Sequence, residues 1–391
     1  MLDLSPHKVG NFGNGQTVTT VSKQWLSRTP DQKFLSLDDL HQSVNARREQ
    51  SIESTITLKS VEVIAPEIQT RDDTHKLSLG LPDGREVSPS HWTFGQLCQQ
   101  AGAPTKYLRQ LPTQIGADAL NYSLRFTAPR EQMMLLDDGV TARAITSPTY
   151  GRIFDADVVQ AVQNIAGNGT GDSNWKVPGT LDWSSMTYNP HTPVTAETTT
   201  LFASDRDVFM FLVDDLHPIE VGKLPDGSPD LMFRGFYVSN SEVGSGSLRI
   251  AAFYLRAVCC NRILWGVENF QEVAMRHSRY APDRFLEEAR PALESYAQGS
   301  SQTLIEGVQK AKAAKVASDD DDALAFLQAR SFSKAKAALV LEAVEREEQT
   351  KARTVWDMAQ GITAVARKTE NTDTRLEMEM QARKLLDKVA A

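Results

Sequence analysis

Residues 231–262 decide the fold, and they read LMFRGFYVSNSEVGSGSLRIAAFYLRAVCCNR. The first part, Leu231–Val238, is typical of a buried strand. Small polar residues and two glycines then form a loop up to Ser247. From Ser247 to Trp265 the sequence is largely apolar, so we predict the most apolar helix of the protein there. Ser247 is its expected N-cap, and Gly266 is expected at its C-terminal end.

The sequence on either side of this stretch alternates strand-like runs with helices at irregular intervals. A helix is expected from Asp155 to Gly167, and a compact helical module over roughly residues 91–123. Further strands are expected at 181–188, 197–203 and 208–213. Regular alternation of strand and helix, as in a parallel dinucleotide-binding fold, is missing. The sequence therefore predicts an α+β fold with a central, mostly antiparallel sheet and inserted helices.

The composition changes along the chain and predicts three regions. Residues 1–50 form a polar N-terminal arm, with a short helix expected at Leu37–Arg48. Residues 51–285 form the α+β core domain. Residues 286–391 are rich in Ala, Glu, Lys, Arg and Gln and form a helical C-terminal region that we expect to mediate packing or oligomerisation. Four aspartates at 319–322 favour the N-terminus of one of its helices.

Composition and charge exclude several classes of protein. Of the 391 residues, 41% are hydrophobic, which is enough for a sizeable core. The formal charge of −8 excludes a uniformly basic nucleic-acid coat. Apolar runs reach only six residues, as at Val208–Val213, whereas a membrane span needs roughly 20. The N-terminus lacks the features of a signal peptide, and three cysteines are too few for a disulfide framework. We expect a cytoplasmic protein without a membrane partner.

Motifs for catalysis, metal binding or cofactor binding are missing from the sequence. It contains no HExxH, GxSxG or CxxC, and its seven histidines are scattered. We therefore predict no catalytic residue, no metal ligand, no cofactor and no enzymatic activity. A hydrolase or nuclease that uses Asp205, Asp207 or Glu242 with a metal ion remains a third, weaker hypothesis.

Arginines gather around the loop and the expected helix. Residues 231–280 contain six arginines, three glutamates and no lysine. Arg249 and Arg256 are seven residues apart, which would place them on one helix face about 10 Å apart. Backbone N–H groups at a helix N-terminus bind phosphate, although the loop fits neither the P-loop nor the dinucleotide fingerprint. Salt bridges to acidic residues of 205–220 are the alternative role for these arginines. The expected nucleic-acid-binding residues are Arg249, Arg256, Arg262, Arg276, His277, Ser245 and Ser247.

Three blocks of the sequence resemble a known family. They read SPTYGRIFDADVVQAV (147–162), YVSNSEVGSGSLRIAAFYLRAVCCNRILWG (237–266) and RHSR (276–279). Together they resemble the phage/plasmid-like proteins catalogued as domain of unknown function 932, with a likeness over roughly residues 80–285. Arg262 stands where a glycine often follows the asparagine. The resemblance implies an origin on a mobile element and leaves the activity open.

These observations lead to one functional hypothesis and one alternative. The first is a non-enzymatic protein of phage or plasmid DNA metabolism that binds single-stranded DNA and anneals strands as a homo-oligomer joined through its C-terminal helices. An outline similar to that of single-strand annealing proteins is part of this hypothesis, by analogy of fold alone. The alternative is a protein-interaction module, such as an inhibitor of a host defence or restriction enzyme, that presents acidic segments such as Asp319–Asp322.

Overall fold

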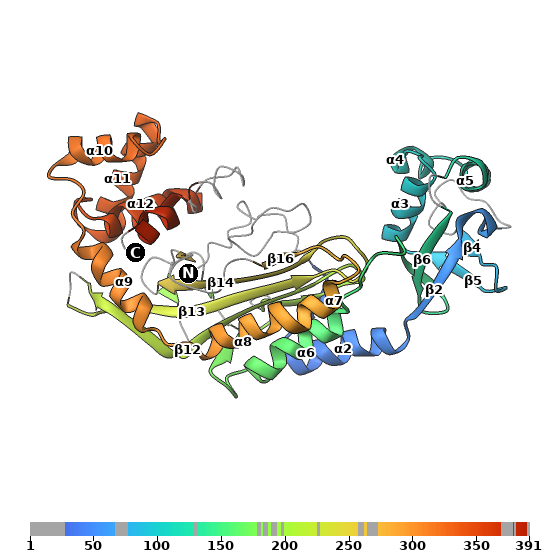
Figure 1. Cartoon of the computed structure of the whole chain (residues 1–391), viewed down its shortest axis with the longest axis horizontal. Helices are drawn as coiled ribbons and strands as arrows, with labels where there is room; N and C mark the ends of the chain where they lie inside the picture. Colours follow the sequence, from blue (N-terminus) through green and yellow to red (C-terminus); the bar gives the residue numbers. More distant parts are fainter. Residues whose placement is uncertain are drawn as a thin grey trace.

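A computed structural model describes most of the chain, in an elongated arrangement of three parts (Figure 1). A small module lies at one end, a large sheet in the middle and a helical region at the other end. The described residues are 28–66, 77–128, 131–177, 181–182, 187–188, 194–196, 199–224, 227–256, 262–263, 273–368, 378 and 381–388.

The large sheet is antiparallel and is built around three long strands. These are β12 (Val208–Lys223), β13 (Pro229–Asn240) and β14 (Leu248–Arg256). Its order is β1-β11-β12-β13-β14-β15, with β8 also paired to β12 and β16 to β14. The bounds of the short strands are β1 (Lys33–Phe34), β8 (Trp175–Lys176), β11 (Leu201–Ala203), β15 (Arg262–Ile263) and β16 (Val273–Met275). A separate pair joins β9 (Leu181–Asp182) to β10 (Thr187–Tyr188).

Helices α2 (Leu37–Glu49), α6 (Asp155–Ala166) and α8 (Arg290–Gln298) cover one face of the large sheet (Figure 1). Before α8, the helix α7 (Ala281–Arg284) continues through a π-helical turn at Phe285–Ala289. The apolar side chains of α2 and α6 belong to the same buried cluster as the inward side chains of the strands. Part of the expected N-terminal arm therefore contributes to the main core.

The small module has its own sheet and its own core. Its strands pair in the order β2-β6-β7-β5-β4-β3, and only β5 and β7 run parallel. Their bounds are β2 (Ile52–Thr57), β3 (Glu62–Ile64), β4 (Ser78–Gly80), β5 (Glu86–Pro89), β6 (Gln132–Asp137) and β7 (Thr141–Thr146). Helices α3 (His91–Gln100), α4 (Thr105–Leu108) and α5 (Thr113–Phe126) complete it. Its buried cluster runs from Ile56 to Ile145 and is separate from the main one.

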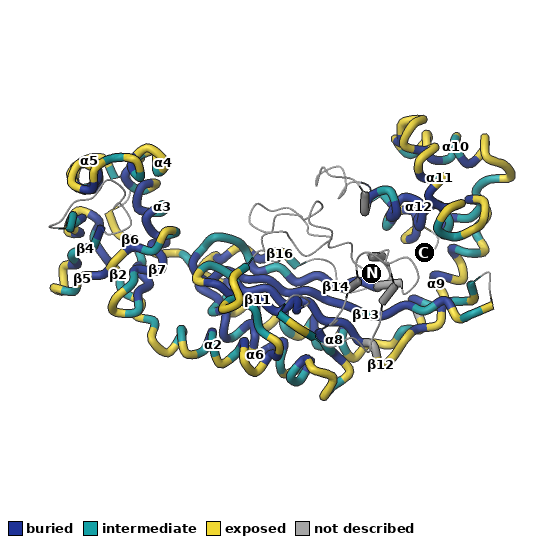
Figure 2. The backbone as a smooth tube through the Cα atoms, turned by 180° about the vertical axis from the view of Figure 1, so that it is seen from behind, coloured by how far each residue is buried: buried dark blue, intermediate teal, exposed yellow. Residues whose placement is uncertain are grey.

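The C-terminal region is helical, and its described helices share the main buried cluster with the large sheet. Their bounds are α9 (Gln302–Ala313), α10 (Asp320–Gln328), α11 (Lys334–Glu348) and α12 (Val355–Lys368), and a further helical segment spans 381–388. Figure 2 shows buried segments both in the long strands and in α12. The predicted α+β class, with a mostly antiparallel sheet and a helical C-terminal region, is confirmed.

The helix predicted from Ser247 to Trp265 is wrong, because Leu248–Arg256 forms the strand β14. The strand pairs with β13 on one side and with β15 and β16 on the other. Consecutive residues of β14 are buried, from Ile250 to Tyr254. A strand buried on both faces gives a continuous apolar run, which periodicity cannot distinguish from a buried helix.

None of the described helices is long and apolar enough to cross a membrane.

We expect Asp319→Ala to destabilise α10. The Asp319 carboxylate caps this helix by accepting a hydrogen bond from the Asp322 N–H at 2.9 Å. Loss of such a cap typically costs about 1 kcal/mol. Hydrogen exchange of the α10 amides should show a free energy of local opening lower by that amount. Asp321→Ala removes a neighbouring charge without removing the cap, so it should have a clearly smaller effect, and equal effects would contradict the capping role.

Candidate functional site

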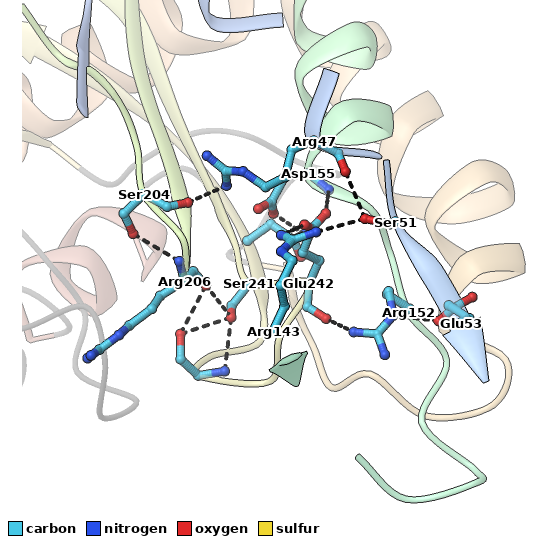
Figure 3. A network of polar contacts seen from close by, with 12 residues as sticks. Arg47, Ser51, Glu53, Arg143, Arg152, Asp155, Ser204, Arg206, Ser241 and Glu242 are labelled. Atoms are coloured by element: carbon cyan, nitrogen blue, oxygen red, sulfur yellow. Dashed lines mark hydrogen bonds and ion pairs between the residues drawn. The ribbon is translucent and has the colours of Figure 1, made fainter. Parts of the chain in front are cut away.

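A buried ion pair joins the small module to the large sheet (Figure 3). Glu242 follows the end of β13, and Arg143 lies on β7 of the small module. Their side chains are only 2% and 6% exposed, and the guanidinium donates to the Glu242 carboxylate. Arg143 also donates to the Ser51 hydroxyl at 2.8 Å. The second Glu242 oxygen accepts the Asp155 N–H at 2.9 Å, which fixes the first turn of α6.

A second arginine, Arg152, closes the same junction. It donates to the Glu242 main-chain carbonyl and pairs with the Glu53 carboxylate at 2.6 Å. Its guanidinium lies over the Tyr150 ring, 5.3 Å from the centroid. Both arginines are buried and each is paired with a carboxylate, Arg143 with the buried Glu242 and Arg152 with the half-exposed Glu53, so they hold the two sheets together and are not open to a ligand.

Asp155 is completely enclosed beside this ion pair. One oxygen accepts a hydrogen bond from the Asn240 amide at 2.8 Å, whereas the other has no partner among the described residues. Burial, and then the nearby Glu242 carboxylate, raises the pKa of Asp155 well above its ordinary value. The environment therefore disfavours the charged form of Asp155.

The loop between β13 and β14 is held in place along most of its length. Trp92 and Gln96 of α3 each donate to the Val243 carbonyl at 3.0 Å. The Ser241 and Ser245 hydroxyls both donate to the Arg206 carbonyl, at 2.6 and 3.2 Å. The N–H of Ser245 donates to the Ser241 hydroxyl inside the loop. With β14 a strand, the loop does not lead into a helix, so the expected helix-dipole site for phosphate is wrong.

His277 is buried next to the loop and is not a surface cation. Its ring stacks on Tyr150 at 4.9 Å, and its Nδ1 lies 3.2 Å from the Gly151 carbonyl. Burial lowers the pKa of His277 to about 4. A Cβ atom on Gly151 would lie 2.0 Å from the Ser278 carbonyl oxygen, so glycine is required for this close approach. The neutral ring at pH 7 corrects the expectation that His277 offers charge to phosphate.

The structure brings together only part of the predicted site. Ser245, Ser247 and Arg276 lie at the same end of the large sheet, because Leu248 pairs with Met275. Arg249 lies on β14 opposite Ala274 and is partly buried.

Arg256 and Arg262 lie elsewhere, which corrects the predicted grouping. Arg256 pairs with Met232 at the far end of β14, about 23 Å from Arg249 at the usual rise of a strand. Arg262 is on β15, opposite Leu255. The side chains of both arginines lie outside the described residues, and the helical spacing argument for Arg249 and Arg256 no longer applies.

Three arginines lie at this end of the large sheet, and only Arg276 is among the predicted binding residues. The Arg206 guanidinium donates to the His91 Nδ1 at 2.8 Å and lies over the Trp92 ring, while Arg276 and Arg279 are exposed. Within the described parts of the chain, none of these three arginines forms an ion pair. We call Arg206, Ser245, Ser247, Arg276 and Arg279 the arginine rim.

Sequence reasoning missed the roles of Arg143, Arg152 and Asp155 and considered Glu242 only as a candidate metal ligand in the third hypothesis. Arg152 and Asp155 lie in the first family-like block, and Glu242 lies in the second. The presence of Arg152, Asp155 and Glu242 in the family-like blocks is the signal that could have linked these residues. In the described segments, no group of three His, Cys, Asp or Glu side chains could hold a metal ion. Asp207, one of the candidate ligands, pairs with Arg28 at 2.8 Å.

A comparison with protein families matches residues 190–389 to the family described as "Domain of unknown function (DUF932)". The match includes the C-terminal helices, which we expected to lie outside the resemblance, and it excludes the block at 147–162. No curated protein and no solved structure matches the chain significantly.

We expect Glu242→Gln to destabilise the protein by about 3 kcal/mol, because it leaves the buried Arg143 without its countercharge. Urea unfolding measures the free energy. Asp157→Asn is the matched control, since it breaks an ion pair with Arg48 whose two side chains are about 40% exposed. That variant should lose at most about 1 kcal/mol. Equal losses in both variants would contradict a special role for the junction.

We also expect His277→Gln to reduce the fall in the free energy of unfolding at acidic pH. The native ring has a pKa of about 4, below its ordinary value of 6.5. Between these values the unfolded chain binds a proton that the native state does not, so the free energy of unfolding falls as the pH falls from 6.5 towards 4. Urea unfolding at several pH values should show a smaller fall for the variant. An unchanged slope would contradict the buried, neutral state of His277.

Proposed function

We propose that this chain, which belongs to the domain of unknown function 932 family, binds single-stranded DNA at the arginine rim. In this proposal it is a phage- or plasmid-encoded protein of DNA metabolism. The observation that carries the proposal is the presence, around one rigid loop, of three arginines that form no ion pair with any described residue. Guanidinium groups that lack carboxylates are available for phosphate, which they bind through paired N–H donors.

The surroundings of the rim favour an anionic ligand. Burial and the charges of Arg109 and Arg206 lower the pKa of His91. The guanidinium groups of Arg109 and Arg206 both act on this ring, and the Asp205 carboxylate opposes them. An overall charge of −8 makes such a local concentration of arginine informative, because it does not follow from composition.

Exposed aromatic and hydroxyl groups next to the rim favour a single strand over a duplex. Tyr280 directly follows Arg279 and is 66% exposed. Unpaired bases stack on such rings, whereas the bases of a duplex are not available for stacking. The hydroxyls of Ser147 and Thr149 lie in the adjoining turn and could donate to phosphate oxygens.

The proposal also includes the annealing of DNA strands and the self-assembly of the protein. The C-terminal helices, which we expected to mediate self-assembly, pack their buried residues into the main cluster. In the acidic run at 319–322, Asp319 caps α10 and Asp320 pairs with Arg353 and Lys351, so part of its charge is engaged within the chain. The alternative, a protein-interaction module that presents this acidic segment, stays a hypothesis. The prediction that the protein is not an enzyme stays a prediction.

Replacement of the three arginines tests the proposal. In the triple variant Arg206→Ala, Arg276→Ala and Arg279→Ala, we expect weaker binding to a labelled single-stranded oligonucleotide, measured by fluorescence anisotropy across a salt series. The slope of log affinity against log salt should fall by about 2, since each phosphate contact on a single strand contributes about 0.7. A duplex of the same sequence should bind more weakly than the single strand.

The control is a triple variant that removes the same charge from α11: Lys334→Ala, Lys336→Ala and Arg346→Ala. These three residues are exposed and lie far along the chain from the rim. If both triple variants lose the same affinity and slope, binding depends on net charge and the rim is not the site. If the parent protein does not bind at low salt, the proposed function is wrong.

A further inference from the structure

Helix α5 has two apolar faces, and only one of them is buried. Its inner face contributes Ala117, Leu120 and Leu124 to the core of the small module. Its outer face exposes Ile115, Tyr122 and Phe126, at 53%, 64% and 67%. An ordinary surface helix carries polar residues on its outer face, so a second apolar face needs an explanation.

The exposed residues form one continuous stripe. With Ala119, which is partly buried and also packs against the core of the small module, they occupy positions i, i+4, i+7 and i+11, and these positions lie on one line along a helix. The Tyr122 and Phe126 rings already contact each other, with centroids 5.1 Å apart. We call Ile115, Ala119, Tyr122 and Phe126 the α5 stripe.

The position of α5 leaves the stripe accessible. The helix lies at the outer end of the small module, away from the large sheet and the C-terminal helices (Figures 1 and 2). The exposed large apolar side chains of the C-terminal region, Leu286 and Leu339, lie on separate elements and form no comparable stripe among the described residues.

We infer that the α5 stripe is an interface with a second copy of this chain, in which the two α5 helices pack antiparallel about a twofold axis. This inference is independent of the proposed DNA binding. In this inference the surface for self-assembly is the α5 stripe and not the C-terminal helices.

Charge complementarity identifies the partner as a second copy. Asp118 and Arg125 are exposed, lie seven residues apart on the same flank of the stripe, and form no ion pair with the described residues. In an antiparallel helix pair, each flank meets the same flank of the partner, at positions related by the twofold axis. An axis between residues 121 and 122 therefore places Asp118 of each copy beside Arg125 of the other. Asp118 has only a local hydrogen bond from Gln114, at 2.9 Å.

The same axis also brings the two stripes together. It places Phe126 of each copy level with residue 117 of the other, between Ile115 and Ala119, and the two Tyr122 rings close to the axis. A side chain that enters the space between two residues of the facing helix is the usual geometry of helix packing. A pair of 14-residue helices is a small interface, so we expect a dimer that dissociates on dilution and not a permanent one.

Sedimentation equilibrium of the full chain, from about 1 to about 100 µM, tests the inference at the affinities expected of small interfaces. The parent chain should show a concentration-dependent approach to the mass of a dimer. Phe126→Glu should raise the dissociation constant by at least about 100-fold, because it places a carboxylate in the apolar contact. Asp118→Arg and Arg125→Asp should each raise it by about tenfold through like charges across the axis.

The double variant Asp118→Arg with Arg125→Asp is the decisive control. It restores opposite charges only if the partner is a second copy of the same helix, so it should recover the parental dissociation constant. Leu339→Glu on α11 should leave the dimer unchanged. A parent chain that stays monomeric at about 100 µM, or a dimer broken by Leu339→Glu and not by Phe126→Glu, would overturn the inference. So would loss of oligonucleotide binding in Phe126→Glu with an unchanged mass, since the stripe would then contact nucleic acid.

Discussion

The carboxylate of Glu242 is buried where three parts of the chain meet, and the arrangement of these parts depends on it. A buried charge needs a partner of opposite sign and hydrogen bonds to its remaining lone pairs. Arg143 of the small module provides the opposite charge, and the Asp155 N–H of α6 provides one of the hydrogen bonds. These groups belong to β7, to α6 and to the end of β13. The ion pair and hydrogen bond of the Glu242 carboxylate therefore hold the small module, a covering helix and the large sheet together.

This junction also determines what the neighbouring surface can do. The loop that follows Glu242 is anchored by α3 on one side and by the Arg206 carbonyl on the other. Arginines at its edge are therefore presented from a rigid support, while Arg143 and Arg152 are used internally. Pre-ordered cations lose less conformational entropy on binding than cations on a mobile loop. The proposed DNA site thus depends on buried residues that would not contact the ligand.

The elongated arrangement separates the two proposed surfaces. The arginine rim lies near the small module, because Arg206 contacts His91 and Trp92 of α3. Helix α5, which carries the α5 stripe, lies at the outer end of that module (Figure 1). A dimer formed through α5 would leave the rim of each copy accessible. Two rims in one assembly could bind the same strand or two complementary ones, which raises the effective concentration of the second contact. Annealing would follow from such a geometry without a catalytic group.

Sequence alone determined the elements with strong local signals. These are the strands at 208–213 and 231–238, the helices after Leu37 and Asp155, the helix N-terminus at the aspartates of 319–322, and the family through its ordered blocks. Tertiary structure decided the rest. Residues 248–256 have an apolar run that fits a helix or a doubly buried strand equally well, and only pairing with β13, β15 and β16 selects the strand. Likewise, Arg143, Asp155 and Glu242 lie up to 99 residues apart, so no local pattern reveals that they share one buried site. His277 is basic by type, but its enclosure beside Tyr150 and Gly151 removes its charge, because desolvation depends on the surrounding fold and not on neighbouring residues in the sequence.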